Sequence, residues 1–131
     1  MSRKFTLLIV LILMLVAMAA GCKSGQTKLT AADNGKTIEV KAGDQIIIEL
    51  EGNPSTGYNW EANNLDAGLI QQVGEPEFKS SSPGLIGSGG SITLTFEILK
   101  AGTTTLNLVY HRPWETNVAP LSTFAVTIVA K

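Results

Sequence analysis

The sequence predicts an all-β domain, built as an antiparallel sandwich or barrel. Apolar and polar residues alternate with a period of two along most of the chain after residue 35, which is typical of half-buried strands. Short turn signals separate the alternating runs, among them Asn34-Gly35, Ala42-Gly43-Asp44 and Ala101-Gly102. We find no convincing amphipathic helix. Regular short strands with turns between them favour packed layers of sheet.

The predicted strands follow in chain order. The clearest alternation covers residues 36–41, 45–51, 91–99, 103–111 and 122–130. Weaker candidates cover residues 58–62, 69–73 and 76–79, and residues 61–69 are expected to form at most one short helical turn. Trp60 follows Tyr58 by two residues on such a strand, so we expect it in the core.

Length and charge exclude several classes of function. The chain has 131 residues, which suits one domain, and its net charge of −1 gives no electrostatic footprint for nucleic acid. The sequence contains one Cys and one His. An internal disulfide is therefore impossible, and a structural zinc site has too few Cys/His ligands. We expect no metal, no cofactor and a monomer.

The first 21 residues predict a secretory signal peptide. Arg3 and Lys4 precede an unbroken apolar run over residues 7–20, which is shorter than the ~20 residues of a membrane span. The following segment, Ala19-Ala20-Gly21-Cys22, resembles a bacterial lipobox. That resemblance implies lipidation of Cys22 with acyl chains such as palmitate; the alternative is simple cleavage near Gly21, which leaves a free thiol. We expect a polar tether over residues 22–26 and the folded domain over 27–131.

These features predict where the protein resides. We expect it to be exported and lipid-anchored to the cell envelope, at the periplasmic or outer surface. Stable anchoring takes more than one acyl chain, which the bacterial lipoprotein modification supplies.

The first unusual loop reads Asn53-Pro54-Ser55-Thr56-Gly57-Tyr58. Pro54 fixes its own φ and favours an extended Asn53, while Gly57 can adopt a positive φ and reverse the chain. Small residues remain at the tip, so this loop is narrow enough to enter a cleft. The alternative is a tight polar turn without function.

The second unusual loop covers residues 79–90 and ends in Gly87-Ser88-Gly89-Gly90. The glycines leave the backbone bare, so it can approach another backbone closely. Phosphate binding is disfavoured because a strand follows, whereas a phosphate loop opens a helix. A flexible linker remains the alternative.

The third unusual loop begins at His111-Arg112-Pro113-Trp114. Pro113 stops strand pairing, and a loop Trp beside an Arg is the composition of an interface hot spot. The alternative is a Trp folded back onto the end of the sheet. His111 has no evident nucleophile or orienting acid, so we interpret it as a surface residue at a strand end rather than a catalytic group.

Taken in order, the three loops are specific. NPSTGY, GSGG and RPW on an all-β domain of this size resemble the chagasin family of cysteine protease inhibitors, over roughly residues 27–131. The family pattern NPTTG matches here except that Ser55 replaces Thr. Its GxGG pattern corresponds to residues 87–90 and its RPW to residues 112–114.

The resemblance implies a fold and a mechanism. The fold would be an immunoglobulin-like β-sandwich, and the chain would be a reversible, tight-binding inhibitor of papain-like cysteine proteases, not an enzyme. The first loop would enter the cleft over the catalytic thiol, with the other two loops flanking it. The protease-binding residues would be Asn53, Pro54, Ser55, Thr56, Gly57, Tyr58, Gly87, Ser88, Gly89, Gly90, Arg112, Pro113 and Trp114. The alternative is a lipid-anchored sandwich that binds a glycan or an envelope partner.

Overall fold

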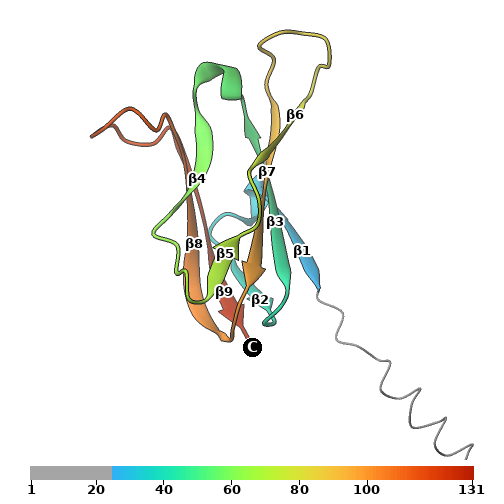
Figure 1. The fold of residues 1–131 in the computed structure, drawn as a ribbon, viewed down its shortest axis with the longest axis vertical. Helices are drawn as coiled ribbons and strands as arrows, with labels where there is room; N and C mark the ends of the chain where they lie inside the picture. Colours follow the sequence, from blue (N-terminus) through green and yellow to red (C-terminus); the bar gives the residue numbers. More distant parts are fainter. Residues whose placement is uncertain (1–24) are drawn as a thin grey trace, which may run out of the picture.

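The computed structural model of this chain describes residues 25–131 (Figure 1). The predicted signal peptide and Cys22 lie outside the described residues. Two β-sheets face each other and nearly all of the described secondary structure is strand, so the prediction of an all-β, immunoglobulin-like sandwich is confirmed. No helix within residues 25–131 has the length and apolar character to cross a bilayer.

The first sheet is built around its longest strand. β7 (Gly90–Ile98) pairs with β3 (Gln45–Gly52) on one side, and β3 pairs with β1 (Gln26–Thr30). On its other side β7 pairs with two short strands in succession, β5 (Ile70–Gln72) and β6 (Glu77–Ser80). Only the β1–β3 pair is parallel in this sheet.

The second sheet has the order β2-β9-β8-β4. Its long central hairpin joins β8 (Gly102–His111) to β9 (Ser122–Ala130), with β4 (Asn59–Asn63) beside β8 and β2 (Thr37–Val40) parallel to β9. Two single turns of 3-10 helix complete the described elements, η1 (Ala31–Asp33) and η2 (Pro54–Thr56).

The core lies between the sheets and follows the alternation in the sequence. In β7 every second residue is buried, and β8 and β9 repeat the pattern against it. Burying each such Leu, Ile or Phe contributes roughly 1.5–3 kcal/mol, so these three strands supply much of the stability. Trp60 is 6% exposed, and its predicted place in the core is confirmed. The side chains with least exposure are Phe96, Phe124, Ile46, Ile48, Ile70, Leu94, Ile98, Leu106, Leu108, Ile128 and Val126.

The structure departs from the sequence prediction at its first strand. β1 is absent from the predicted set, because Leu29 is its one buried residue and a single apolar position carries no period. The predicted tether of residues 22–26 therefore ends one residue inside β1. The one short turn allowed for residues 61–69 forms at the end of this segment, where the N–H groups of Leu69 and Ile70 donate to the carbonyl of Asp66 at 3.0 and 2.9 Å.

The connections divide the sandwich into two unlike ends (Figure 1). At the upper end of that view lie the links β3–β4, β6–β7 and β8–β9, which are the three unusual loops. We call this the loop end. At the other end lie the tight turns β2–β3 and β7–β8, the beginning of β1 and the C-terminus. We call this the tethered end, and define it by residues 41–44, residues 99–101, Gly25 and Lys131.

Candidate functional site: three loops at one end of the sandwich

The first loop, residues 53–58, is a 3-10 turn held by its own side chains. The Asn53 side chain accepts hydrogen bonds from the N–H of Ser55 at 3.2 Å and from its hydroxyl at 2.5 Å. The Thr56 hydroxyl donates to the Asn53 carbonyl at 2.6 Å. Gly57 ends the turn at φ 84°, a left-handed value that favours glycine. Local chemistry thus fixes the tip, and Ser55 and Thr56 are exposed as predicted.

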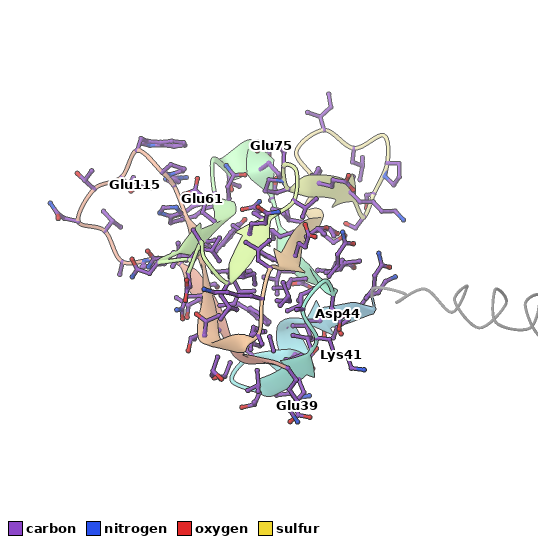
Figure 2. All side chains as sticks on the ribbon, turned by 60° about the horizontal axis from the view of Figure 1, so that its bottom comes forward. Glu39, Lys41, Asp44, Glu61, Glu75 and Glu115 are labelled. Atoms are coloured by element: carbon purple, nitrogen blue, oxygen red, sulfur yellow. The ribbon has the colours of Figure 1, made fainter. Side chains whose placement is uncertain are left out.

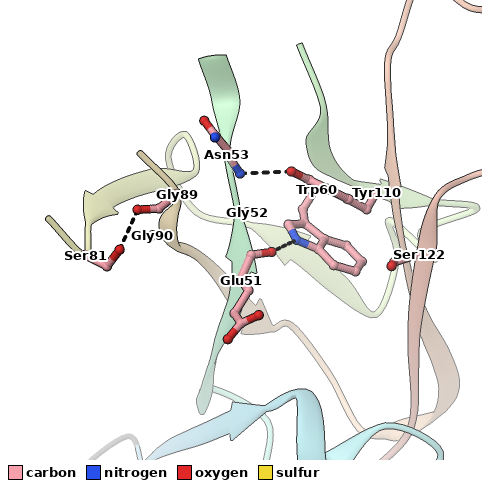
Figure 3. A pocket seen from close by; sticks show the side chains of 9 residues that line it. All are labelled: Glu51, Gly52, Asn53, Trp60, Ser81, Gly89, Gly90, Tyr110 and Ser122. Atoms are coloured by element: carbon pink, nitrogen blue, oxygen red, sulfur yellow. Dashed lines mark hydrogen bonds between the residues drawn. The ribbon is translucent and has the colours of Figure 1, made fainter. Parts of the chain in front are cut away.

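Asn53 also joins the first loop to the rest of the loop end. Its side-chain amide donates to the carbonyl of Gly87 in the second loop at 3.0 Å. Its backbone N–H donates to the hydroxyl of Tyr110, at the end of β8, at 2.9 Å. Figure 3 shows this second bond beside that from the Trp60 indole N–H to the Glu51 carbonyl at 3.0 Å. The first loop is therefore braced against both sheets.

A hollow of about 520 Å³ lies at this brace (Figure 3). Trp60 and Tyr110 stack in its wall with ring centroids 5.1 Å apart. Its other lining residues are Glu51, Gly52, Asn53, Ser81, Gly89, Gly90 and Ser122. The lining of the hollow includes one carboxylate, that of Glu51, and no histidine, cysteine or lysine.

The second loop, residues 81–89, has a fixed base and an exposed tip. Ser81 donates to the Gly89 carbonyl both from its N–H at 3.1 Å and from its hydroxyl at 2.7 Å. The Ser88 hydroxyl lies 2.8 Å from that of Ser80 across the base. At the tip Ile86 is fully exposed and Leu85 is 68% exposed. The base is set by hydrogen bonds, while the apolar tip contributes nothing to the core.

The backbone of the second-loop glycines makes more hydrogen bonds within the protein than the sequence indicates. The carbonyls of Gly87 and Gly89 already accept bonds from Asn53 and Ser81, and Gly90 is the first residue of β7. Within the described residues no acceptor has hydrogen-bond geometry to the N–H groups of Gly87, Ser88 and Gly89. These three N–H groups therefore remain as unused backbone donors within the described part of the chain. At Gly90 a Cβ would collide with the Lys79 carbonyl, which explains the need for glycine there.

The third loop, residues 112–121, is joined to the first by Arg112. The guanidinium Nε donates to the Thr56 carbonyl at 3.0 Å, and the guanidinium carbon lies 4.5 Å from the centre of the Tyr58 ring. Glu115 holds the other side of the guanidinium at 3.5 Å. Arg112 and Tyr58 are thus supports of the loop end, a role that their place in the sequence motifs does not reveal.

Trp114 combines the two interpretations that the sequence left open. Its ring rests on Gly57, because a Cβ at Gly57 would collide with the indole. Yet 67% of the residue is exposed, next to the exposed Pro113. The contact fixes the orientation of the ring and leaves its outer face free. This is the arrangement of a preorganised aromatic anchor.

The predicted site residues all lie at the loop end, but they divide into two groups. Ser55, Thr56, Gly87, Pro113 and Trp114 face solvent, whereas Asn53, Pro54, Gly57, Tyr58, Ser88, Gly89, Gly90 and Arg112 are half-buried. Sequence reasoning missed Tyr110, Ser80 and Ser81. For Tyr110 a signal existed: it is the last inward residue of β8, and a hydroxyl on a buried face needs a partner.

The remaining ionisable groups do not form a catalytic arrangement at the loop end. His111 pairs with Glu61 at 2.7 Å on the neighbouring strand and is half-exposed, which confirms its place as a strand-end surface residue. Among residues 25–131 no cluster of three or more His, Cys, Asp or Glu side chains is arranged to hold a metal. The site therefore offers shape, backbone donors and one aromatic face rather than reactive groups.

Carboxylates with a perturbed pKa lie outside the three loops. The pKa of Asp44 is lowered because the N–H groups of Lys41 and Gly25 donate to its carboxylate, at 2.9 and 2.8 Å. The pKa of Asp33 is lowered chiefly by the N–H of Thr30 and then by the ammonium of Lys36. Both bind backbone or neighbouring side chains, so these pKa shifts indicate structural roles.

A rigid sandwich that gathers three braced loops at one end defines a protein that acts by binding. The chain belongs to the chagasin family of peptidase inhibitors, whose description (Chagasin family peptidase inhibitor I42) matches residues 39–128. It is therefore a peptidase inhibitor and not an enzyme, as the sequence predicts.

Relatives and solved structures agree with this membership. Amoebiasin-2 of Entamoeba histolytica is 34% identical over 105 residues, covering 79% of this chain and 84% of the relative. Chagasin of Trypanosoma cruzi is 36% identical over 93 residues, covering 66% of this chain and 82% of the relative. The crystal structure of the cysteine protease inhibitor EhICP2 from Entamoeba histolytica matches with a TM-score of 0.72 and 30% identity. It covers 85% of this chain and 100% of the other.

Proposed function

We propose that this chain inhibits papain-like cysteine proteases by occluding the active-site cleft with the three loops of its loop end. The first loop enters the cleft over the catalytic thiol. The second loop donates backbone hydrogen bonds on one side, and Trp114 packs on the other. Similarity to EhICP2, which is a cysteine protease inhibitor, supports the target class.

The observation that carries this mechanism is the bracing of the first loop. Its tip is small and exposed, yet it is tied to the second loop through Asn53 and to the third through Arg112. A tip that is already ordered loses little conformational freedom on binding, so more of the contact energy appears as affinity. Inhibition then requires no bond to the thiol and is reversible.

A competition titration tests the mechanism. Complex formation is measured with three forms of papain: active enzyme, a variant with the catalytic Cys changed to Ala, and enzyme whose cleft is filled by a bulky covalent inhibitor. We expect binding to the first two forms and none to the third. Undiminished binding to the blocked enzyme would place the contact away from the cleft and refute the mechanism.

The leader supports a second part of the proposal, which concerns location. The protein is exported, cleaved before Cys22 and lipidated there, and acts as a monomer at the cell envelope. The small residues before the sole cysteine of the chain support this processing. With Cys22→Ser we expect unprocessed precursor, whereas the natural chain partitions into detergent. Intact-mass measurement of a mature chain with a free thiol would contradict it.

A further inference from the structure

The beginning of the described chain is fastened at the tethered end. The N–H of Gly25 donates to the Asp44 carboxylate at 2.8 Å, and its carbonyl accepts from the N–H of Gln45 at 2.9 Å. The same carboxylate accepts from the N–H of Lys41 at 2.9 Å. Asp44 thus holds the start of β1 against the β2–β3 turn. Figure 2, which brings this end forward, shows Asp44 beside Lys41 at the start of β1.

The chain between Cys22 and Gly25 is too short to bring the loop end near an anchor. Three peptide steps span at most about 11 Å, because consecutive Cα atoms are about 3.8 Å apart. The sandwich is much longer, since the nine residues of β7 alone extend for about 30 Å at ~3.3 Å per residue. The three loops lie at the far end of that strand (Figure 1). An acyl group on Cys22 therefore holds one end of the domain close to the bilayer.

The chemistry of the tethered end suits a lipid headgroup surface. Lys41, Lys100 and Lys131 are exposed there, together with Leu99, which is 41% exposed. Three carboxylates lie nearby and balance these lysines: Asp44, Asp66, and Glu39, which pairs with Lys131 at 3.2 Å. Asp66 accepts from the N–H of Gly68 at 3.2 Å. Over residues 25–131 acidic side chains outnumber basic ones, whereas at this end the two kinds are equal in number. This end therefore lacks the excess of negative charge that an anionic leaflet repels.

We propose that the tethered end docks on the membrane surface and directs the three loops away from it. The inference rests on the proposed lipidation of Cys22. The partner surface is a bilayer that contains anionic lipid, contacted by the turns at residues 41–44 and 99–101. The protease then meets the inhibitor from the aqueous side, at a distance from the bilayer set by the length of the sandwich. Anchoring and inhibition use opposite ends and do not compete.

The two tryptophans make this orientation measurable. Trp114 is exposed at the loop end, while Trp60 is buried and provides a constant background. The mature chain from Cys22 onward is coupled through that sole cysteine to a maleimide lipid. It is then placed on vesicles of phosphatidylcholine and phosphatidylglycerol that contain brominated lipid, which quenches nearby tryptophan. Because coupling is chemical, the test of orientation does not depend on natural lipidation.

Three proteins are compared on these vesicles. The natural sequence reports the loop end, Trp114→Phe reports the background from Trp60, and Trp114→Phe combined with Leu99→Trp reports the tethered end. We expect quenching of the tryptophan at position 99 and none of Trp114. The natural sequence should also inhibit papain on vesicles with the same Ki as in solution, which shows in addition that the coupled domain is folded.

Every other outcome of these experiments contradicts one part of the proposal. Quenching of Trp114 places the loops at the membrane and refutes the orientation, and quenching of neither reporter refutes the docking of the tethered end. Failure to inhibit papain in solution refutes the proposed function, while the quenching pattern still decides the orientation. Absence of acyl chains on protein extracted from cells refutes the natural anchor, and with it the relevance of the orientation.

Discussion

The two ends of the sandwich are closed by different kinds of bond. At the tethered end backbone groups bond mainly to each other: Gly43 donates to the Ile98 carbonyl at 2.7 Å, and Ile98 donates to the Asp44 carbonyl at 2.9 Å. The Asp44 carboxylate adds a side-chain link there. At the loop end side chains make the links between elements, through Asn53, Tyr110 and Arg112.

Because of this difference, we expect the residues that set stability and the residues that set inhibition to lie at opposite ends of the molecule. A turn closed by backbone bonds depends less on side-chain identity, and at the tethered end the exceptions are Asp44, whose carboxylate accepts backbone N–H groups, and Gly43, whose φ is positive. A loop held by side chains depends on the identity of each of them. We therefore expect changes at the loop end to alter inhibition first, and changes at the tethered end to alter stability alone.

The largest effect is expected from lengthening the first loop. Two glycines inserted between Ser55 and Thr56 break the turn and move the Thr56 carbonyl away from Arg112. Inhibition of papain should be lost, while the melting temperature changes little, because lengthening a surface loop has a small entropic cost. Inserting the same glycines between Gly84 and Leu85, at the exposed tip of the second loop, is the control and should retain most of the inhibition.

Removal of the aromatic anchor is expected to have the next largest effect. Truncation of such an anchor typically costs on the order of 2–4 kcal/mol, so Trp114→Ala should weaken binding by roughly 30- to 1000-fold. Titration measures the affinity and thermal melting the stability. Trp60→Ala should do the reverse, because Trp60 is a core residue. An equal fall of melting temperature in both variants would mean that Trp114 is structural.

Alanine substitution of one glycine at each end compares the loop end with the tethered end directly. Gly57 and Gly43 have φ of 84° and 91°, so alanine at either costs roughly 1–2 kcal/mol in backbone strain. At Gly43 the new methyl enters open space, whereas at Gly57 it collides with Trp114. Both variants should melt at a lower temperature, but only Gly57→Ala should also lose affinity, by about 10- to 100-fold, since each ~1.4 kcal/mol is a factor of ten. Equal affinities would show that the Trp114–Gly57 contact does not position the anchor.

Tyr110→Phe tests the brace beneath the first loop. It removes the hydroxyl that accepts from the Asn53 N–H and keeps the ring stacked on Trp60. Loss of such a hydrogen bond costs about 0.5–1.5 kcal/mol, so affinity should fall by roughly 2- to 10-fold. Tyr58→Phe is the matched control, because the Tyr58 contacts found here involve its ring. Unchanged affinity for Tyr110→Phe would show that the turn holds its shape without the brace.

The smallest effect on inhibition is expected at Asp44. Its pKa is lowered in the folded state, so its carboxylate stabilises the fold above its ordinary pKa of 3.8. That contribution to stability is lost as the pH falls through the lowered pKa that Asp44 has in the folded state. Asp44→Asn should therefore lower the melting temperature at neutral pH and reduce its decline below about pH 3.8. Papain inhibition at neutral pH should not change. A loss of inhibition would show that the two ends are coupled.

The strands were predictable because their signal is local. Alternation within β7, β8 and β9 places side chains on opposite faces whatever the rest of the chain does, and the buried residues are those that the alternation selects. β1 was not predictable, because an edge strand with one buried residue is recognised only once β3 is beside it.

The chemistry of the loops was also readable from local sequence. Pro54 and Gly57 determine a narrow turn through their own φ preferences, and three glycines determine a second loop with little side-chain cover. Through their resemblance to known motifs, the three loops in this order predicted the family and the inhibitor class, and the family match confirms both.

Only the tertiary structure decided which of those residues face solvent and which hold the loops in place. Arg112 reaches the carbonyl of Thr56 from 56 residues away, and Tyr110 reaches Asn53 from 57 residues away. Such contacts depend on how the two sheets pack, and they leave no period or spacing in the sequence. The position of the chain start opposite the loops has the same origin, since the pairing of β1 with β3 sets it.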